Sequence, residues 1–295
     1  MSTFLLIIIS GLGLGSLYFL LAAGLSVIFG LMRVLSFAHG AFLSASGFAS
    51  WMVLRSFETP STPQLLLALV VSVLTGGAVA YLAEVLLVRP LKGKELEQLL
   101  VTVGLGMVLV ALMAGIWGPD EHLIPRPAWL TDTTSIAGAP ISNSRLLLIG
   151  LAGVVVVGIH LILSRTRYGL IIRAGVENSA MVSALGINVK RAFTLVFVAG
   201  GMLAGLGGGL AGTYYGGISP FLGDGMLIFS FIVLIIGGLG SINGALIASV
   251  VLGVSQSVAN YYVLNGIGDV LVVVLLVATL LVRPQGLLGQ KERLI

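Results

Sequence analysis

Long apolar runs, separated by short polar connections, fill most of this 295-residue chain. A helix needs about 20 mostly apolar residues to cross a bilayer, and runs of that length recur along the sequence. Charged residues make up 9% of the chain, whereas they make up about a quarter of an ordinary soluble domain. Because so few charges cannot cover a soluble surface of this size, the sequence predicts a protein embedded in membrane lipid.

The apolar runs predict an all-α fold, a polytopic transmembrane helical bundle with eight spans. The predicted spans cover 4–32, 34–54, 64–88, 99–117, 146–163, 192–214, 226–253 and 270–282. Several glycines and Asn243 interrupt the run that starts at Met226, so this run is either one helix or two shorter ones. Nine or ten spans are therefore also possible.

Basic residues indicate which ends of the spans face the cytoplasm. The net charge is +4, but Lys and Arg lie in short connections between apolar runs, as the positive-inside rule describes. We therefore expect no nucleic-acid partner, and a nine-span count would put the N-terminus outside. Three basic clusters are placed in the cytoplasm: Arg89, Lys92 and Lys94; Arg165, Arg167, Arg173, Lys190 and Arg191; Arg283, Lys291 and Arg293.

One long connection, over 118–144, is expected on the outer side. It contains four prolines and lacks a strong apolar run. Proline removes a backbone donor and clashes with the preceding helical turn, so this composition disfavours a long helix.

The sequence offers no cofactor site. The chain has no Cys and three scattered His, so neither disulfides nor a metal cluster is expected. The phosphate-binding pattern G-x-x-x-x-G-K-[ST] is absent, and the glycine string over 205–212 lies inside an apolar run, not between a strand and a helix. If transport uses ATP, another chain must bind it.

Glycine is abundant, with 41 residues, about twice its usual frequency. Glycines four residues apart let two helix backbones approach closely, which favours tight packing, although sliding helices or a pore lining are the alternative. Pairs with this spacing inside predicted spans are Gly11 and Gly15, Gly201 and Gly205, Gly205 and Gly209, and Gly208 and Gly212.

Few ionisable side chains fall at membrane depth. Glu84 lies about one turn before Arg89 and is expected to reach the interface. His160, near a span end, has the same interpretation. His39 lies among small residues at the start of a span, and it is either a packed interfacial side chain or part of a pathway or gate. The lack of a carboxylate pair or a proton-relay chain disfavours an ion-coupled pump.

The segment over 165–191 is too polar to span the membrane. Val176, Ala180 and Ala184 recur at helical spacing, and Gly186 supplies a helix stop before the next span. This pattern predicts a short cytoplasmic helix with a modest apolar face. It either lies on the bilayer surface or docks a soluble subunit.

Four motifs, in matching order along the chain, resemble those of the LivH-like family of branched-chain amino acid ABC importer permeases. The first is Phe37-Ala38-His39-Gly40, similar to the family's FAHG element. The second, in the cytoplasmic segment, contains Arg173, Ala174, Glu177, Asn178, Ala180, Gly186, Ile187 and Asn188. The third is GGLGSINGA over 237–245, similar to GGIGSIPGA with Asn243 in place of the more usual Pro. The fourth is VRPQGLLG over 282–289, similar to the family's P-x-G-[IL]-x-G ending.

The resemblance implies a single transmembrane permease domain over 1–295 of a bacterial inner-membrane importer, with no catalysis of its own. Its implied partners are a second related permease, two ATPase subunits that bind ATP, and a periplasmic solute-binding protein. The coupling segment at about 165–191 would contact an ATPase through Arg173, Glu177, Asn178, Ala180, Gly186, Ile187 and Asn188. The pathway or gate candidates are His39, Gly237, Gly238 and Asn243.

The substrate stays open at this stage. Branched-chain amino acids are the family's usual cargo, but relatives carry urea, amides, other amino acids or aromatic acids. No mid-membrane Arg is available to hold a carboxylate, and half-helix N-termini near 237–244 are the alternative. A stand-alone secondary transporter and a membrane-embedded enzyme with His39 and His160 are the competing function classes.

Overall fold

The structure is a computed structural model, and it describes residues 2–167, 169–171, 174, 181–182 and 189–289. Within this part of the chain, six helices are long and apolar enough to cross a membrane, by length and composition. They are α1 (Ser2–Met32), α3 (Thr62–Ala83) with its continuation η1 (Glu84–Val88) and η2 (Arg89–Leu91), α4 (Glu95–Trp117), α6 (Asn143–Arg165), α9 (Val189–Tyr215) and α11 (Ile242–Tyr262).

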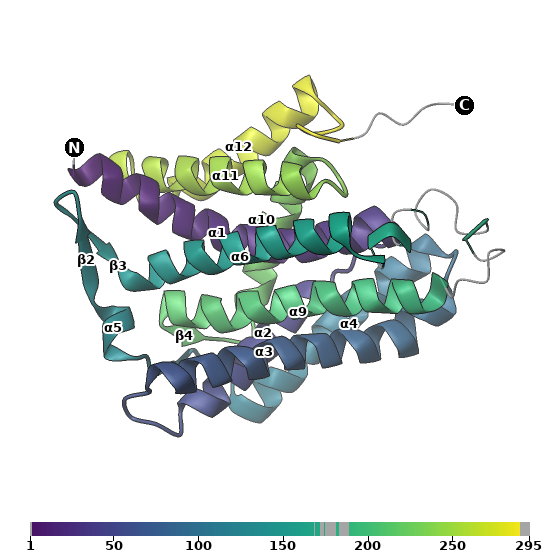
Figure 1. Cartoon of the computed structure of the whole chain (residues 1–295), viewed down its shortest axis with the longest axis horizontal. Coiled ribbons are helices and arrows are strands. Elements are labelled where there is room, and N and C mark those ends of the chain that lie inside the picture. The colour runs from purple at the N-terminus through teal and green to yellow at the C-terminus, as the bar shows by residue number, and fades with distance from the viewer. Residues whose placement is uncertain (1, 168, 172–173, 175–180, 183–188, 290–295) are drawn as a thin grey trace.

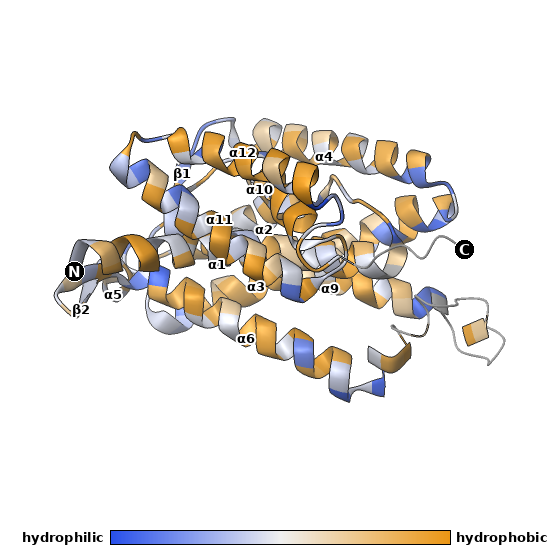
Figure 2. Ribbon diagram, turned by 90° about the horizontal axis from the view of Figure 1, so that it is seen from above, coloured by the Kyte–Doolittle hydropathy of each residue, from blue (hydrophilic) through white to orange (hydrophobic). Residues whose placement is uncertain are grey.

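Three shorter helices complete the bundle: α2 (His39–Leu54), α10 (Leu222–Gly237) and α12 (Ile267–Val282). The expected all-α bundle is thereby confirmed, and the long helices are apolar along most of their length (Figure 2). The number of eight spans stays a prediction, because length and composition do not establish which helices cross the whole bilayer.

The apolar run from Met226 forms two helices, one of the alternatives left open by the sequence. Helix α10 ends at Gly237 and α11 begins at Ile242. Between them Gly238 and Gly240 have φ values of 100° and 81°, a left-handed region that glycine enters at little cost.

The predicted span over 34–54 is wrong at its start. Arg33 has a left-handed φ of 53°, which ends α1, and no helix forms before His39. Ser36 O accepts from His39 N at 3.3 Å, so a turn leads into α2. The apolar residues of the connection had suggested helix, but this short segment packs against α4, where Phe37 N donates to Thr102 Oγ1.

The two ends of the bundle differ in composition. At one end lie the start of α1, the short helix α5 (Ala128–Thr131) and the hairpin of β2 (Thr133–Ile136) and β3 (Ala139–Ser142) (Figure 1). There β1 (His122–Leu123) also pairs antiparallel with β4 (Gly217–Ile218). This end is called the outer end below, and its connection over 118–144 contains no long helix, as predicted.

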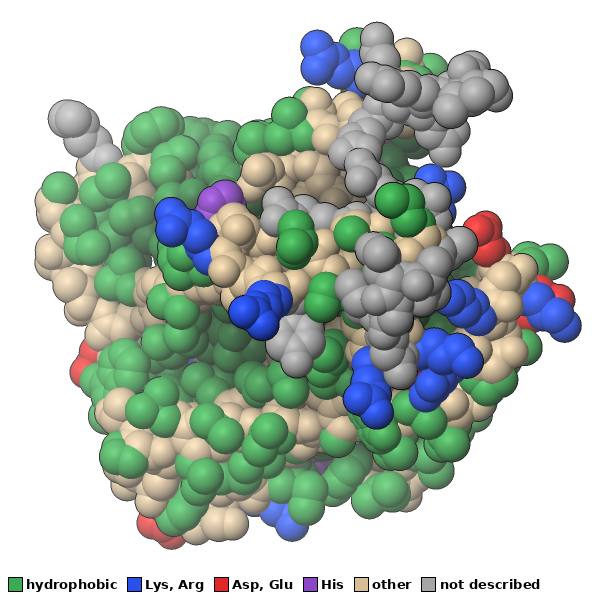
Figure 3. Space-filling model, turned by 45° about the vertical axis from the view of Figure 1, so that its right-hand side comes forward, with side chains coloured by type: hydrophobic (Ala, Val, Ile, Leu, Met, Phe, Trp, Pro, Cys, Tyr) green, Lys and Arg blue, Asp and Glu red, His purple; other side chains and the backbone are tan. Residues whose placement is uncertain are grey.

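The opposite end, called the inner end below, carries many basic side chains. Arg33, Arg89, Lys92 and Lys190 line one pocket there, and Lys and Arg side chains gather on this end of the surface (Figure 3). These residues come from three different connections in the sequence. Their common side agrees with the predicted cytoplasmic placement.

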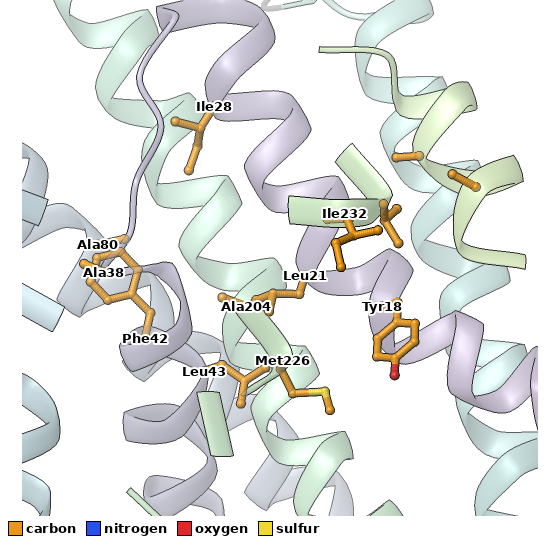
Figure 4. Close-up of a cluster of buried hydrophobic side chains, with 14 of the residues drawn as sticks. Tyr18, Leu21, Ile28, Ala38, Phe42, Leu43, Ala80, Ala204, Met226 and Ile232 are labelled. Atoms are coloured by element: carbon orange, nitrogen blue, oxygen red, sulfur yellow. The ribbon is translucent and has the colours of Figure 1, made fainter. Parts of the chain in front are cut away.

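Glycines bring the long helices into close contact. A Cβ on Gly205 of α9 would lie 2.5 Å from Ser72 O of α3, and one on Gly15 of α1 would lie 2.5 Å from Ser249 O of α11. Tight packing therefore explains these glycines. Buried side chains from α1, α2, α9 and α10, among them Leu21, Leu43, Ala204 and Met226, fill the space between them (Figure 4).

Candidate functional site

Helices α2 and α10 begin inside the bundle, and their first turns lie against each other. A Cβ on Gly40 of α2 would lie 2.5 Å from Gly223 O of α10. Gly223 N also donates to Ser44 Oγ at 2.8 Å, and this hydroxyl is fully buried. The first turns of the two half-helices are therefore held together by backbone packing and a hydrogen bond.

This junction lies near the middle of the bundle. Helix α2 reaches the outer end, where Trp51 Nε1 donates to Leu123 O at 3.2 Å. Ser44 lies ten residues before Leu54, the last residue of α2, a distance of about 15 Å along a helix. The hydrocarbon core of a bilayer is about 30 Å thick, so Gly223 lies near its midplane if the bundle stands along the bilayer normal.

The two half-helices run in opposite directions from this junction. Helix α2 proceeds to the outer end, whereas α10 proceeds to the inner end, where Gly240, just after it, packs against Gly30 of α1. The N-terminus of a helix carries a partial positive charge and unpaired N–H groups. In membrane transporters, discontinuous helices of this kind place such ends beside substrate and ion sites.

His39, a predicted pathway or gate residue, begins α2. Its side chain is fully buried, and neither ring nitrogen has a hydrogen-bond partner within the described residues. The ring lies 6.0 Å from that of Phe42, edge to face, and Nε2 faces Gly24 of α1. His39 is thus packed among helices at the junction and is not at the membrane interface.

Gly237 and Gly238, two further gate candidates, form the end of α10. The chain after α12 returns to them: Leu287 N donates to Ile236 O at 2.7 Å and Leu288 N donates to Gly237 O at 3.0 Å. The third and fourth sequence motifs therefore meet in space, which their separation along the chain did not reveal.

Asn243, the last gate candidate, lies in the first turn of α11, just after the α10–α11 turn. It lines a cavity of about 320 Å³ between α6 and α11, together with His160 and Ser164. The first turn of α11 beside it is capped, because Ser241 Oγ accepts from Gly244 N at 3.1 Å. The structure thus brings Asn243 and His160 to one cavity, whereas His39 lies at the junction of the half-helices.

Glu84 lies at the basic inner end, next to α9. Only 2% of the residue is exposed, and Oε2 accepts from Thr194 Oγ1 at 2.9 Å. It begins the π-helical turn η1 and lines a cavity of about 260 Å³ with Arg33, Arg89 and Lys92. The carboxylate is thus buried under α9 beside the basic residues of the inner end.

Sequence reasoning missed Asp224. This residue lies in the first turn of α10, directly after the buried Gly223, and its side chain is exposed. The predicted span begins at Met226, so Asp224 falls outside the predicted spans. The signal was Pro220 followed by Gly223-Asp224-Gly225, a pattern that starts a helix, but nothing in the sequence shows that this helix starts deep in the bundle.

The predicted coupling residues Arg173, Glu177, Asn178, Ala180, Gly186, Ile187 and Asn188 lie outside the described residues. Their neighbours on each side do lie at the inner end. Helix α6 ends at Arg165, and Lys190 at the start of α9 lines the basic cavity.

These features define a polytopic α-helical membrane protein with two opposed half-helices that begin at mid-depth, an architecture typical of transport proteins. The chain belongs to the family described as branched-chain amino acid transport system / permease component, whose model matches residues 7–280. The match covers nearly every helix described above.

Curated relatives match almost end to end. The permease protein BraD of a high-affinity branched-chain amino acid transport system in Pseudomonas aeruginosa is 31% identical over 97% of this chain and 95% of its own length. LivH of Salmonella typhimurium is 29% identical over 96% and 94%. A probable LivH of Methanocaldococcus jannaschii is 28% identical over 93% and 89%.

Among solved structures, PsaBC from Streptococcus pneumoniae in complex with Fab aligns with a TM-score of 0.47 and 12% identity. The alignment covers 97% of this chain and 92% of that chain. A likeness of this size does not define a shared fold.

Proposed function

We propose that this chain is the permease subunit of an ABC importer for branched-chain amino acids. Its membership of the permease family, with relatives aligned over almost their whole length, carries this proposal. The chain would form one transmembrane domain over 1–295 in a bacterial inner membrane, surrounded by lipid. Transport would be a change of conformation, with no bond made or broken by this subunit.

The proposed importer contains three further kinds of subunit. A second related permease would complete the pathway, and two ATPase subunits would bind ATP below the inner end. A periplasmic solute-binding protein would deliver substrate at the outer end, where it would meet the connection over 118–144. No nucleic acid is involved.

The segment over 165–191 is proposed to couple the permease to an ATPase. Arg173, Glu177, Asn178, Ala180, Gly186, Ile187 and Asn188 would fill a groove on that subunit. Gly186→Trp is expected to abolish uptake and substrate-stimulated ATP hydrolysis while the chain still inserts and assembles. Normal uptake by this variant would remove the docking role.

The gate candidates divide into two places under this proposal. His39 lies at the junction of the half-helices, where a small shift of α2 against α10 would change access to the midplane. Gly237, Gly238 and Asn243 lie around the α10–α11 turn, which would act as a hinge at the inner end.

Reconstitution tests the proposed function directly. The chain, co-purified with its partners from native membranes, would be placed in liposomes with ATP inside and binding protein outside. Uptake of labelled leucine, isoleucine or valine that requires ATP is the expected result. Urea, short amides and aromatic acids serve as competitors, and uptake without ATPase subunits would indicate a secondary transporter instead.

A further inference from the structure

We propose that Asp224 binds the ammonium group of the transported amino acid near the membrane midplane. This inference rests on the proposed function, because it assigns a role within amino acid import. It concerns a residue that no motif in the sequence singled out. The argument uses its depth, its exposure and the groups beside it.

Depth comes from the neighbouring residue. Gly223 N is bonded to Ser44 Oγ, and Ser44 is about 15 Å along α2 from the outer end. Asp224 follows Gly223 directly, in the first turn of α10, so its carboxylate leaves the helix at nearly the same depth. The side chain of Asp224 is short, so its carboxylate stays close to the depth of Gly223.

The carboxylate has no partner within the described residues. No hydrogen bond or ion pair to its side chain is present there, although its backbone N donates to Phe221 O at 3.1 Å. A charged group at this depth is costly against lipid, so such residues face a water-filled path or another polar group. The exposed side of α10 at Asp224 therefore lines a path or faces a partner, and does not face hydrocarbon.

The surroundings of Asp224 fit the ammonium end of a zwitterion that also carries an apolar side chain. Phe221, one turn before it, is 52% exposed, and Ile228, one turn after it, is 61% exposed. A Cβ on Gly225 would meet nothing within 4 Å. The exposed stripe thus presents a carboxylate between two apolar side chains and an open backbone, which matches an ammonium group attached to an aliphatic side chain.

The helix itself favours the ionised form of this carboxylate. The N-terminal end of α10 carries partial positive charge, and an acidic residue in the first turn is stabilised there. An ionised carboxylate forms short, charge-assisted hydrogen bonds with ammonium donors. An arriving ammonium group would therefore favour the charged form of Asp224 further.

The chain has no Cys, which permits a charge-restoration test on the complete importer. Asp224→Cys would be assembled with all partner subunits in liposomes, and uptake of labelled leucine measured before and after treatment with thiosulfonate reagents. A reagent that adds a sulfonate restores negative charge, whereas one that adds a trimethylammonium group does not. The same treatment of the complex with the natural chain controls for thiols on partner subunits.

We expect Asp224→Cys to raise the KM for leucine uptake by about tenfold or more, because a contact with a charged group is lost. The sulfonate reagent is expected to recover part of the lost uptake, and the cationic reagent none. Glu58→Cys, at an exposed carboxylate between α2 and α3, serves as the matched control and should keep the natural KM.

Four results would overturn the proposal. The first is an unchanged KM for Asp224→Cys, and the second is equal recovery with both reagents. The third is an introduced thiol that neither reagent labels, because a neighbouring subunit then covers this position and no path reaches it. If the Asp224→Cys importer fails to assemble, Asp224→Asn is tested in its place. If neither variant assembles but Asp224→Glu gives normal uptake, the negative charge is needed for assembly, and this result also overturns the proposal.

The proposed function has a separate readout. If the complex with the natural chain carries no amino acid at all, the proposed function fails, whatever Asp224 does. If the natural complex carries leucine and the Asp224 variants behave like it, only the present inference fails.

Discussion

The backbone of Gly40, at the start of α2, lies directly against the backbone of Gly223, at the start of α10. No side chain separates the two helices there, and a Cβ on either residue would collide with a backbone oxygen of the other. Two chain segments that enter the bundle from opposite ends thus meet at one level. Any movement of α2 relative to α10 at this level must change this contact.

Gly40→Ala is expected to weaken this contact. The new methyl group would lie 2.5 Å from Gly223 O, and overpacking of this kind costs about 1–3 kcal/mol. The midpoint of thermal unfolding in detergent should fall, and uptake should fall with it. Gly104→Ala in α4 is the control, because nothing lies within 4 Å of the added group, and the higher helix propensity of Ala should leave its midpoint equal or higher.

Ser44→Ala is expected to destabilise the protein by a different route. It removes the acceptor of Gly223 N and leaves that buried donor unsatisfied, which costs about 1–3 kcal/mol. Ser46→Ala is a matched control on the same helix, because its buried hydroxyl has no partner within the described residues. A thermal midpoint for Ser44→Ala as high as that of Ser46→Ala would show that the bond contributes nothing.

His39→Leu is expected to raise stability and lower uptake. Burial of an imidazole without hydrogen bonds has an unfavourable free energy of roughly 1–3 kcal/mol, which Leu avoids. A group kept at such a cost is expected to serve function. Uptake and thermal midpoint would be measured on the same preparation. Full uptake with a higher midpoint would assign His39 to packing alone, and His160→Leu, at an exposed histidine on α6, should change neither value much.

Gly286→Ala is expected to loosen the inner end of α10. Gly286 has a φ of 78°, and a Cβ there would lie 2.6 Å from Gly238 Cα and from Ile235 O. The left-handed conformation alone costs about 1–2 kcal/mol for a residue with a Cβ. Gly93→Ala measures the cost of the left-handed conformation alone, because Gly93 has a φ of 86° and open space around it. The thermal midpoint should therefore drop further for Gly286→Ala than for Gly93→Ala, and equal drops would rule out the clash.

The sequence predicts the long helices and the basic end well, for physical reasons. A run of about 20 apolar residues has few alternatives to a membrane helix, and Lys and Arg concentrate on one side. The glycine pairs of α9 also predict their own role, since Gly201, Gly205 and Gly209 all pack against α3. Apolar runs, clusters of basic residues and glycine spacing can all be recognised from residues that are close together along the chain.

The junction and its carboxylate were not predictable in the same way. The start of α2 depends on the left-handed Arg33 and on contact with α4, neither of which leaves a local pattern. Asp224 falls outside the predicted spans, and only the bond of its neighbour Gly223 to Ser44, far earlier in the chain, sets its depth. Depth in a membrane is a tertiary property when a helix begins in the middle of the bundle.

Both ends of α10 are completed by remote parts of the chain. Its first turn is held by Ser44, 179 residues before Gly223, and its last carbonyl groups are bonded by Leu287 and Leu288, after α11 and α12. Contacts between residues so far apart close large loops, which makes them late events in folding. The last turn of α10 is therefore expected to reach its final position only after α12 has been synthesised and inserted, so mutations that slow the insertion of α12 would delay the completion of α10.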